Sequence, residues 1–99
     1  MCPAAAALEQ FGKKSLPVAL DVMKLSSSSK ARESAVSVWM FVYRDRAPSG
    51  VALLRRQARG TVDPIAKQNL ISALGMAPKW CGFKDKARCT AAAVMKEQP

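Results

Sequence analysis

The sequence predicts a small α+β domain, in which two or three helices pack on a short antiparallel sheet centred on a buried strand at residues 35–43. This stretch, AVSVWMFVY, is the longest strongly apolar run and holds three of the six aromatic residues. Its β-branched and aromatic residues favour extended backbone. Both alternating sets of side chains are largely apolar, which is typical of a strand covered on both faces. A helix is the alternative interpretation of the same run.

Ninety-nine residues are enough for one domain, which we take to be residues 1–99. Residues 4–11 can form a short helix that ends at Gly12. Residues 16–25, LPVALDVMKL, fit either a helix or a strand, and Pro17 with the valines favours a strand at a sheet edge. Residues 26–33, SSSSKARE, are a polar link. We expect residues 1–15 and 26–33 to be flexible.

The core strand is followed by RDRAPSG, residues 44–50, which reads as a loop because proline and glycine favour turns. Residues 51–59, VALLRRQAR, then have two interpretations. A returning strand would complete a hairpin and pair the backbone groups of the core strand, so this interpretation is preferred. A helix with Ser49 as its N-cap and Gly60 as its C-cap remains the alternative.

Residues 63–75 form the clearest helix. Asp63 is a favourable N-cap, and Pro64 occupies the first helical position. Gly75 and Pro78 are expected to end the helix. One helical face is apolar and comprises Ala66, Leu70, Ile71, Ala73 and Leu74. Residues 80–83, WCGF, then form an apolar turn, and Asp85 is placed to cap a last helix over residues 86–96.

Three cysteines, Cys2, Cys81 and Cys89, do not form the dense, even-numbered set of a disulfide-stapled secreted fold. The sequence therefore predicts no disulfide bridge and an intracellular, reducing compartment: cytoplasm, nucleus or organelle matrix. The first 32 residues have some of the composition of a transit peptide, but Glu9 and Asp21 interrupt it. No apolar run is long enough for a transmembrane helix.

The net charge of +9 is the strongest functional signal, because a basic chain is attracted to polyanions. The preferred hypothesis is non-catalytic binding of nucleic acid, RNA rather than DNA, inside a ribonucleoprotein assembly. The alternative is an accessory or regulatory protein that binds an acidic protein partner and no nucleic acid. A weaker third hypothesis is attachment to an anionic membrane surface. The simplest alternative is a protein whose positive charge serves only its solubility.

Two groups of basic residues are the candidate nucleic-acid contacts. Five of the seven arginines fall within sixteen residues, and the expected hairpin would bring them to one end, where guanidinium groups can grip phosphates. This first group is Arg44, Arg46, Arg55, Arg56 and Arg59. The second group surrounds Trp80 and Phe83 and comprises Lys79, Lys84, Lys86 and Arg88. Basic residues between aromatic residues suit single-stranded nucleic acid. The preferred interpretation of the two aromatic residues is an apolar plug that docks a helix onto the rest of the domain, because Gly75 and Pro78 make the chain turn there. Trp39 and Phe41 are expected in the core.

Catalysis and metal binding have little support in the sequence. The chain has no histidine, the most frequent general base and a common metal ligand. Cys81 and Cys89 lack the second close pair that a zinc site requires. The glycines are scattered and form no phosphate-binding loop. The sequence therefore predicts no enzyme, no metal and no cofactor.

Overall fold

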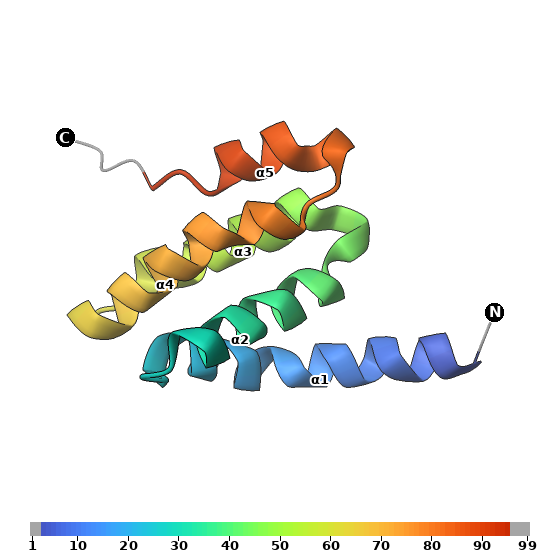
Figure 1. The fold of residues 1–99 in the computed structure, drawn as a ribbon, viewed down its shortest axis with the longest axis horizontal. Coiled ribbons are helices and arrows are strands. Elements are labelled where there is room, and N and C mark those ends of the chain that lie inside the picture. The colour runs from blue at the N-terminus through green and yellow to red at the C-terminus, as the bar shows by residue number, and fades with distance from the viewer. Residues whose placement is uncertain (1–2, 96–99) are drawn as a thin grey trace.

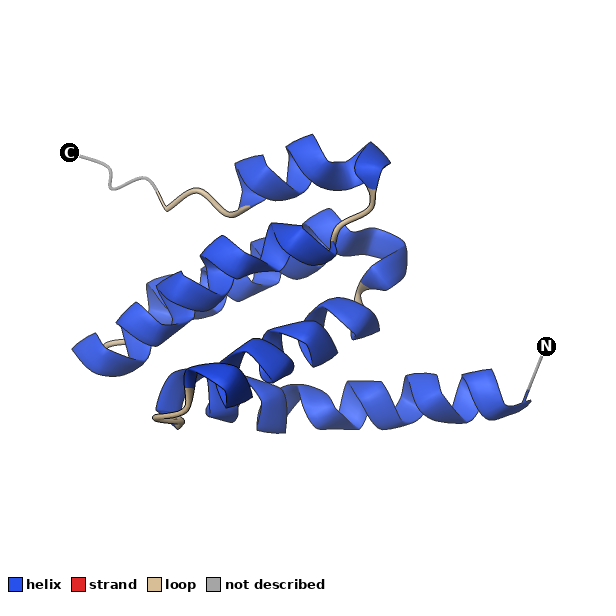
Figure 2. Ribbon diagram, in the orientation of Figure 1, coloured by secondary structure: helices blue, strands red, loops and turns tan. Residues whose placement is uncertain are grey.

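The computed structural model describes residues 3–95, and their side chains from Gly12 onward. Helices make up the described fold (Figures 1 and 2), which contains no strand between residues 3 and 95. Along the chain they are α1 Pro3–Leu25, α2 Ser29–Val42, η1 Arg44–Arg46, α3 Ala47–Gly60, α4 Pro64–Met76, η2 Ala77–Trp80, η3 Phe83–Asp85 and α5 Lys86–Ala92, where η denotes a 3-10 helix. The expected α+β fold with an antiparallel sheet is therefore wrong.

The run at residues 35–43 forms the second half of α2 and not a strand. Its buried residues are Ala35, Val36, Trp39 and Met40, which recur at helical spacing along one face. A helix also satisfies its own backbone hydrogen bonds, so the core segment needs no partner strand. The N-terminus of α2 is fixed locally, because the Ser28 side chain accepts a hydrogen bond from the Ala31 amide.

Two other expected strands are also helical. Residues 16–25 form the C-terminal part of α1, which runs through Gly12 without a break. Ala19 and Met23 are buried at helical spacing. Pro17 lies inside α1 but is exposed to solvent. Residues 51–59 lie in α3, the alternative interpretation, so no hairpin follows residue 43. Of the segments expected to be flexible, residues 3–15 are helical in α1 and residues 29–33 are helical in α2, whereas residues 26–28 form the link between these two helices.

The helix expected at residues 63–75 is confirmed as α4. Asp63 Oδ2 accepts a hydrogen bond of 2.8 Å from the Ala66 amide, as the N-cap assignment predicts. Gly75 does not end the helix, which continues to Met76 before η2 begins. The last helix is present as α5 but ends at Ala92, and Asp85 precedes it without a side-chain capping bond.

The helices are arranged as an antiparallel pair beside a three-helix group (Figure 1). The C-terminal half of α1 packs on α2, and the N-terminal half of α1 extends beyond the end of α2. α3 packs against both α4 and α5, and α4 also contacts α1 and α2. Gly12 lies where α1 crosses α2, since a Cβ atom there would come within 2.9 Å of Val42 Cγ2.

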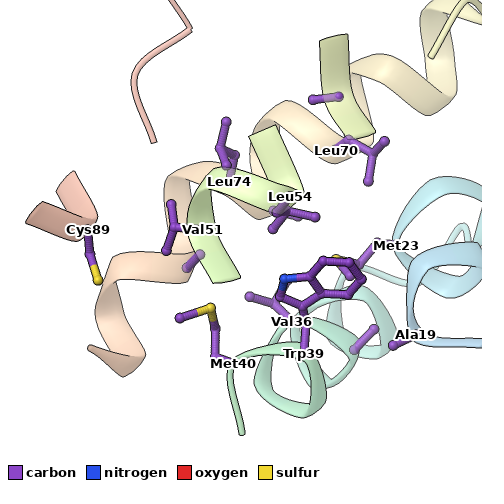
Figure 3. Packing of buried hydrophobic residues seen from close by; sticks show 14 of the residues in the cluster. Ala19, Met23, Val36, Trp39, Met40, Val51, Leu54, Leu70, Leu74 and Cys89 are labelled. Atoms are coloured by element: carbon purple, nitrogen blue, oxygen red, sulfur yellow. The ribbon is translucent and has the colours of Figure 1, made fainter. Parts of the chain in front are cut away.

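The core lies between the pair and the three-helix group (Figure 3). Its largest fully buried side chains are Met23, Val36, Val51, Leu54, Leu70, Leu74 and Cys89. Trp39 is 5% exposed, and its Nε1–H donates a hydrogen bond of 2.9 Å to the Gly50 carbonyl, which joins α2 to α3. The expectation that Trp39 is buried is thus confirmed. Phe41 is 48% exposed, so its expected place in the core is wrong.

A disulfide joins Cys81 to Cys89. It connects the residue after η2 with the buried face of α5, where both cysteines contribute to the core. The expectation of no bridge is therefore wrong. The reducing compartment, which the odd and sparse set of cysteines suggested, stays a prediction. Within residues 3–95, no helix combines the length and apolar character needed to cross a membrane.

Candidate nucleic-acid interface

Three of the candidate arginines share one side of α3. Its buried face comprises Ala47, Gly50, Val51, Leu54 and Ala58. Arg55, Arg56 and Arg59 stand on the other side, in a shallow depression whose remaining lining is Ala52 and Leu53. The spacing i, i+1, i+4 places these guanidinium groups within one turn of each other. We call this surface the α3 arginine face.

The α3 arginine face carries uncompensated positive charge. α3 contains no aspartate or glutamate, and among the described residues no ion pair engages Arg55, Arg56 or Arg59. Arg56 and Arg59 are exposed, and Arg55 is half-buried. Freely presented guanidinium groups bind phosphates in a bidentate manner, so the face can hold a polyanion.

Arg44 and Arg46 lie at the other end of α3, in η1. At 1.5 Å per residue, the step from Arg46 to Arg55 corresponds to about 13 Å along the axis. The expected hairpin is absent, so the five arginines form two separate groups. Arg44 and Arg46 also have structural contacts: their guanidinium carbons lie 4.5 Å from the Phe41 ring centroid and 5.5 Å from that of Tyr43.

The second basic group lies around the start of α5. Lys79 forms an ion pair of 3.5 Å with Glu33 and lies over the Trp80 ring. Lys86 Nζ donates a hydrogen bond of 2.9 Å to the Pro78 carbonyl. Lys84 and Arg88 are exposed and have no such contact within the described part of the chain. Two of the four residues therefore help to hold this corner together.

The two aromatic residues of this corner have different environments. Trp80 packs against the core, as the apolar-plug interpretation predicts. Phe83 is 98% exposed, in η3 between Gly82 and Lys84. An exposed ring beside cations is a suitable stacking platform for an unpaired base. Sequence reasoning placed Phe83 among the docking residues and did not separate it from Trp80.

The α3 arginine face and the second basic group lie on adjoining elements, because α5 packs against α3. The arrangement offers phosphate contacts from α3 and base stacking from Phe83 near α5. It offers no comparable chemistry for metal binding: the described residues contain no cluster of three or more metal-ligating side chains.

Sequence reasoning missed a second surface, an apolar groove between α1 and α2 on the side away from the core. The groove has a volume of about 570 Å³. Its lining is Gly12, Ser15, Val18, Ala19, Val22, Ala31, Ser34, Ala35, Ser37, Val38 and Phe41. The sequence does contain an indication of this groove. Residues 35–43 carry apolar side chains on more sides than one buried helix face requires, but a strand covered on both faces explains the same pattern equally well.

Comparison with known proteins gives no relative: no protein-family model, curated protein or solved structure shows significant similarity to this chain.

Proposed function

We propose that this protein binds RNA without catalysis, with the α3 arginine face as its main phosphate-binding surface. The observation that carries the proposal is the crowding of Arg55, Arg56 and Arg59 on one side of a helix with no acidic residue. The net charge of +9 adds long-range attraction to any polyanion. Counterion release supplies much of the affinity for such a ligand.

Single-stranded RNA fits the surface better than a duplex. Phe83 presents a solvent-exposed ring next to Lys84, and stacking on such rings requires unpaired bases. Phosphate contacts carry no base information, so we expect little sequence preference. A protein of this kind serves as a component of a ribonucleoprotein assembly, where RNA and protein partners supply the specificity.

The direct test is a titration of labelled single-stranded oligouridine with protein at several salt concentrations. Arg55→Gln, Arg56→Gln and Arg59→Gln together remove three charges and keep polar side chains. If each arginine contacts one phosphate, the log–log salt slope falls by about 2, from roughly 0.7 per contact on single strands. The melting temperature stays nearly constant, since exposed charges contribute little to stability.

A matched control removes the same charge elsewhere. Lys13, Lys14 and Lys30 are exposed residues of α1 and α2, and their replacement by glutamine is expected to lower the slope much less. Equal losses in the two triple variants would mean diffuse attraction and no arginine site. Unchanged binding of the arginine variant would refute the proposal. Phe83→Ala separates stacking from charge, because it should weaken RNA binding and leave the salt slope unchanged.

A further inference from the structure

The short helix α5 lies at the outer edge of the molecule, beyond α3 and α4 (Figure 1). It spans seven residues, and a helix of this length is marginal by itself in water. In the fold it packs on α3 and η2. Its stability therefore depends on how firmly it is attached to these two elements.

The apolar attachment of α5 depends mainly on one residue. Cys89 is the buried residue of the helix, and it is fully buried. Ala92, with Ala93 and Met95 just beyond the helix, is only partly buried against the core. Alanine side chains remove little apolar area from water, so these contacts contribute less than a full core residue would.

The polar attachment of α5 is also small. Lys86 Nζ donates an exposed hydrogen bond of 2.9 Å to the Pro78 carbonyl. Within the described residues, no ion pair joins α5 to another element. The disulfide between Cys81 and Cys89 is therefore the strongest link between α5 and the rest of the fold.

The segment between the two cysteines covers the bridge loosely. Residues 82–84 and 86–88 are exposed, and Asp85 is half-buried. A segment without a buried side chain opens locally at a low cost in free energy, without unfolding of the core. Such an opening lets a small thiol reach the bridge.

The other helices have contacts of their own. Apart from Cys89, the largest fully buried side chains all come from α1 to α4: Met23, Val36, Val51, Leu54, Leu70 and Leu74. Two hydrogen bonds of 2.9 Å also join these helices, from Trp39 Nε1 to the Gly50 carbonyl and from Asn69 Nδ2 to the Lys24 carbonyl. Loss of the bridge should therefore leave α1 to α4 folded.

We infer that the Cys81–Cys89 bridge is a redox-sensitive switch that controls the attachment of η3 and α5. The oxidised form holds both elements against α3, and the reduced form releases them from a body of α1 to α4 that stays folded. The predicted reducing compartment agrees with this role, because disulfides in cytosolic proteins are mostly transient and redox-sensing or catalytic.

The chemistry is thiol–disulfide exchange with a dithiol. A thiolate of the dithiol attacks one sulfur of the bridge, the bond between Cys81 and Cys89 breaks, and a mixed disulfide forms. The second thiol of the reagent then attacks the mixed disulfide and closes the reagent's own disulfide. The protein gains two electrons and two protons and ends with two thiols. Oxidised glutathione reverses the reaction and leaves as two molecules of reduced glutathione.

The consequence for RNA binding rests on the proposed function. Phe83 lies in η3, inside the bridged segment of residues 81–89, whereas the α3 arginine face lies on the body that stays folded. The bridge fixes the exposed ring relative to the arginines, so one RNA strand can contact both without further ordering of the protein. Reduction makes this ordering a cost of binding, and the oxidised form therefore binds RNA more tightly.

The test begins with a chain that has a single pair of thiols. The sequence has three cysteines, so Cys2→Ser leaves Cys81 and Cys89 alone. Dithiothreitol gives the reduced form, and oxidised glutathione restores the bridge. Alkylation with iodoacetamide followed by mass spectrometry should label no thiol before reduction and two after it. Two labelled thiols before reduction would show that no bridge forms and would overturn the inference.

Amide hydrogen exchange locates the effect of reduction. Exchange of residues 86–92 should become at least about tenfold faster, whereas residues 64–76 of α4 should stay protected. Cys81→Ser combined with Cys89→Ser should exchange like the reduced form, with or without dithiothreitol. Unchanged exchange of α5 after reduction would overturn the inference. An equal loss of protection in α4 would also overturn it, because the bridge would then support the whole fold.

Titration of labelled oligouridine tests the regulation. Reduction should weaken binding several-fold, and oxidised glutathione should restore it. Phe83→Ala should bind weakly in both states, with little further loss on reduction, because the stacking ring is already absent. Phe41→Ala removes another exposed ring, on α2, and should respond to reduction like the Cys2→Ser chain.

The two proposals fail in different ways. Equal affinity of the oxidised and reduced forms for oligouridine, with α5 released, would overturn the regulation and leave the proposed function intact. Absence of oligouridine binding by the oxidised form would refute the proposed function and its regulation together. Hydrogen exchange would still decide whether the bridge controls the attachment of α5.

Discussion

Apolar side chains are buried more completely in the three-helix group, α3 to α5, than in the α1–α2 pair. In the group, α3 is flanked by α4 and α5, and Val51, Leu54 and Leu70 are fully buried. In the pair, only the inner side is covered, and Val18 and Phe41 remain exposed on the outer side. Two packed helices thus leave a groove on the side where a third helix is missing. Burial follows the number of neighbouring helices more than the hydrophobicity of the residue.

Trp39 lies where the two regions meet, and its replacement is expected to have the largest effect. Trp39→Ala removes a buried ring and its hydrogen bond to the Gly50 carbonyl, and should cost about 3–5 kcal/mol in the free energy of unfolding. Chemical denaturation monitored by circular dichroism measures this loss. Trp39→Phe keeps most of the volume and should cost clearly less. A parent-like midpoint for Trp39→Ala would show that α2 and α3 do not depend on this contact.

The disulfide is the next largest expected contribution, and it joins the residue after η2 to α5. Closing the short loop from Cys81 to Cys89 is worth about 2.5 kcal/mol in the chain-entropy estimate. Replacement of both cysteines by serine should lower stability by that order, and reductant should then have no further effect. Reductant that leaves the melting temperature of the parent unchanged would contradict a contribution from the bridge.

Two glycines test how closely the helices pack. A Cβ atom at Gly50 would lie 2.5 Å from Tyr43 Cβ, so Gly50→Ala should destabilise by about 1–3 kcal/mol. Gly75 has no atom within 4 Å of such a Cβ and is exposed in α4. Gly75→Ala should therefore stabilise by about 0.5–1 kcal/mol through helix propensity. Thermal melts of the two variants in parallel check the opposite signs, and a shared sign would refute this explanation.

The outer face of the pair should give the smallest effect. Val18→Ser changes a side chain that is 64% exposed and should alter stability by about 1 kcal/mol or less, since little buried apolar surface is lost. A loss of several kcal/mol would show that the groove is covered in the protein by itself, and the contrast between the two regions would disappear.

Local chemistry allowed the sequence to determine α4 by itself. Asp63 accepts the Ala66 amide hydrogen bond and Pro64 fits the first turn, so both start signals act within a few residues of the helix. α5 also begins directly after Asp85, although the Asp85 side chain makes no capping bond to it. The excess of arginine and lysine is also a property of composition alone, and it supports the polyanion hypothesis whatever the fold.

The tertiary structure decided the rest. Residues 35–43 contain apolar residues at both the helical and the strand period. Which secondary structure forms depends on which set of side chains other elements bury. Trp39 and Met40 are buried in the core, and Phe41 is not. The separation of Arg46 from Arg55 follows from the helical form of α3. Cys81 and Cys89 are visible in the sequence, but their bond requires η2 and α5 to turn back on each other. Long-range packing sets these features, because the local preferences of the segments are nearly balanced.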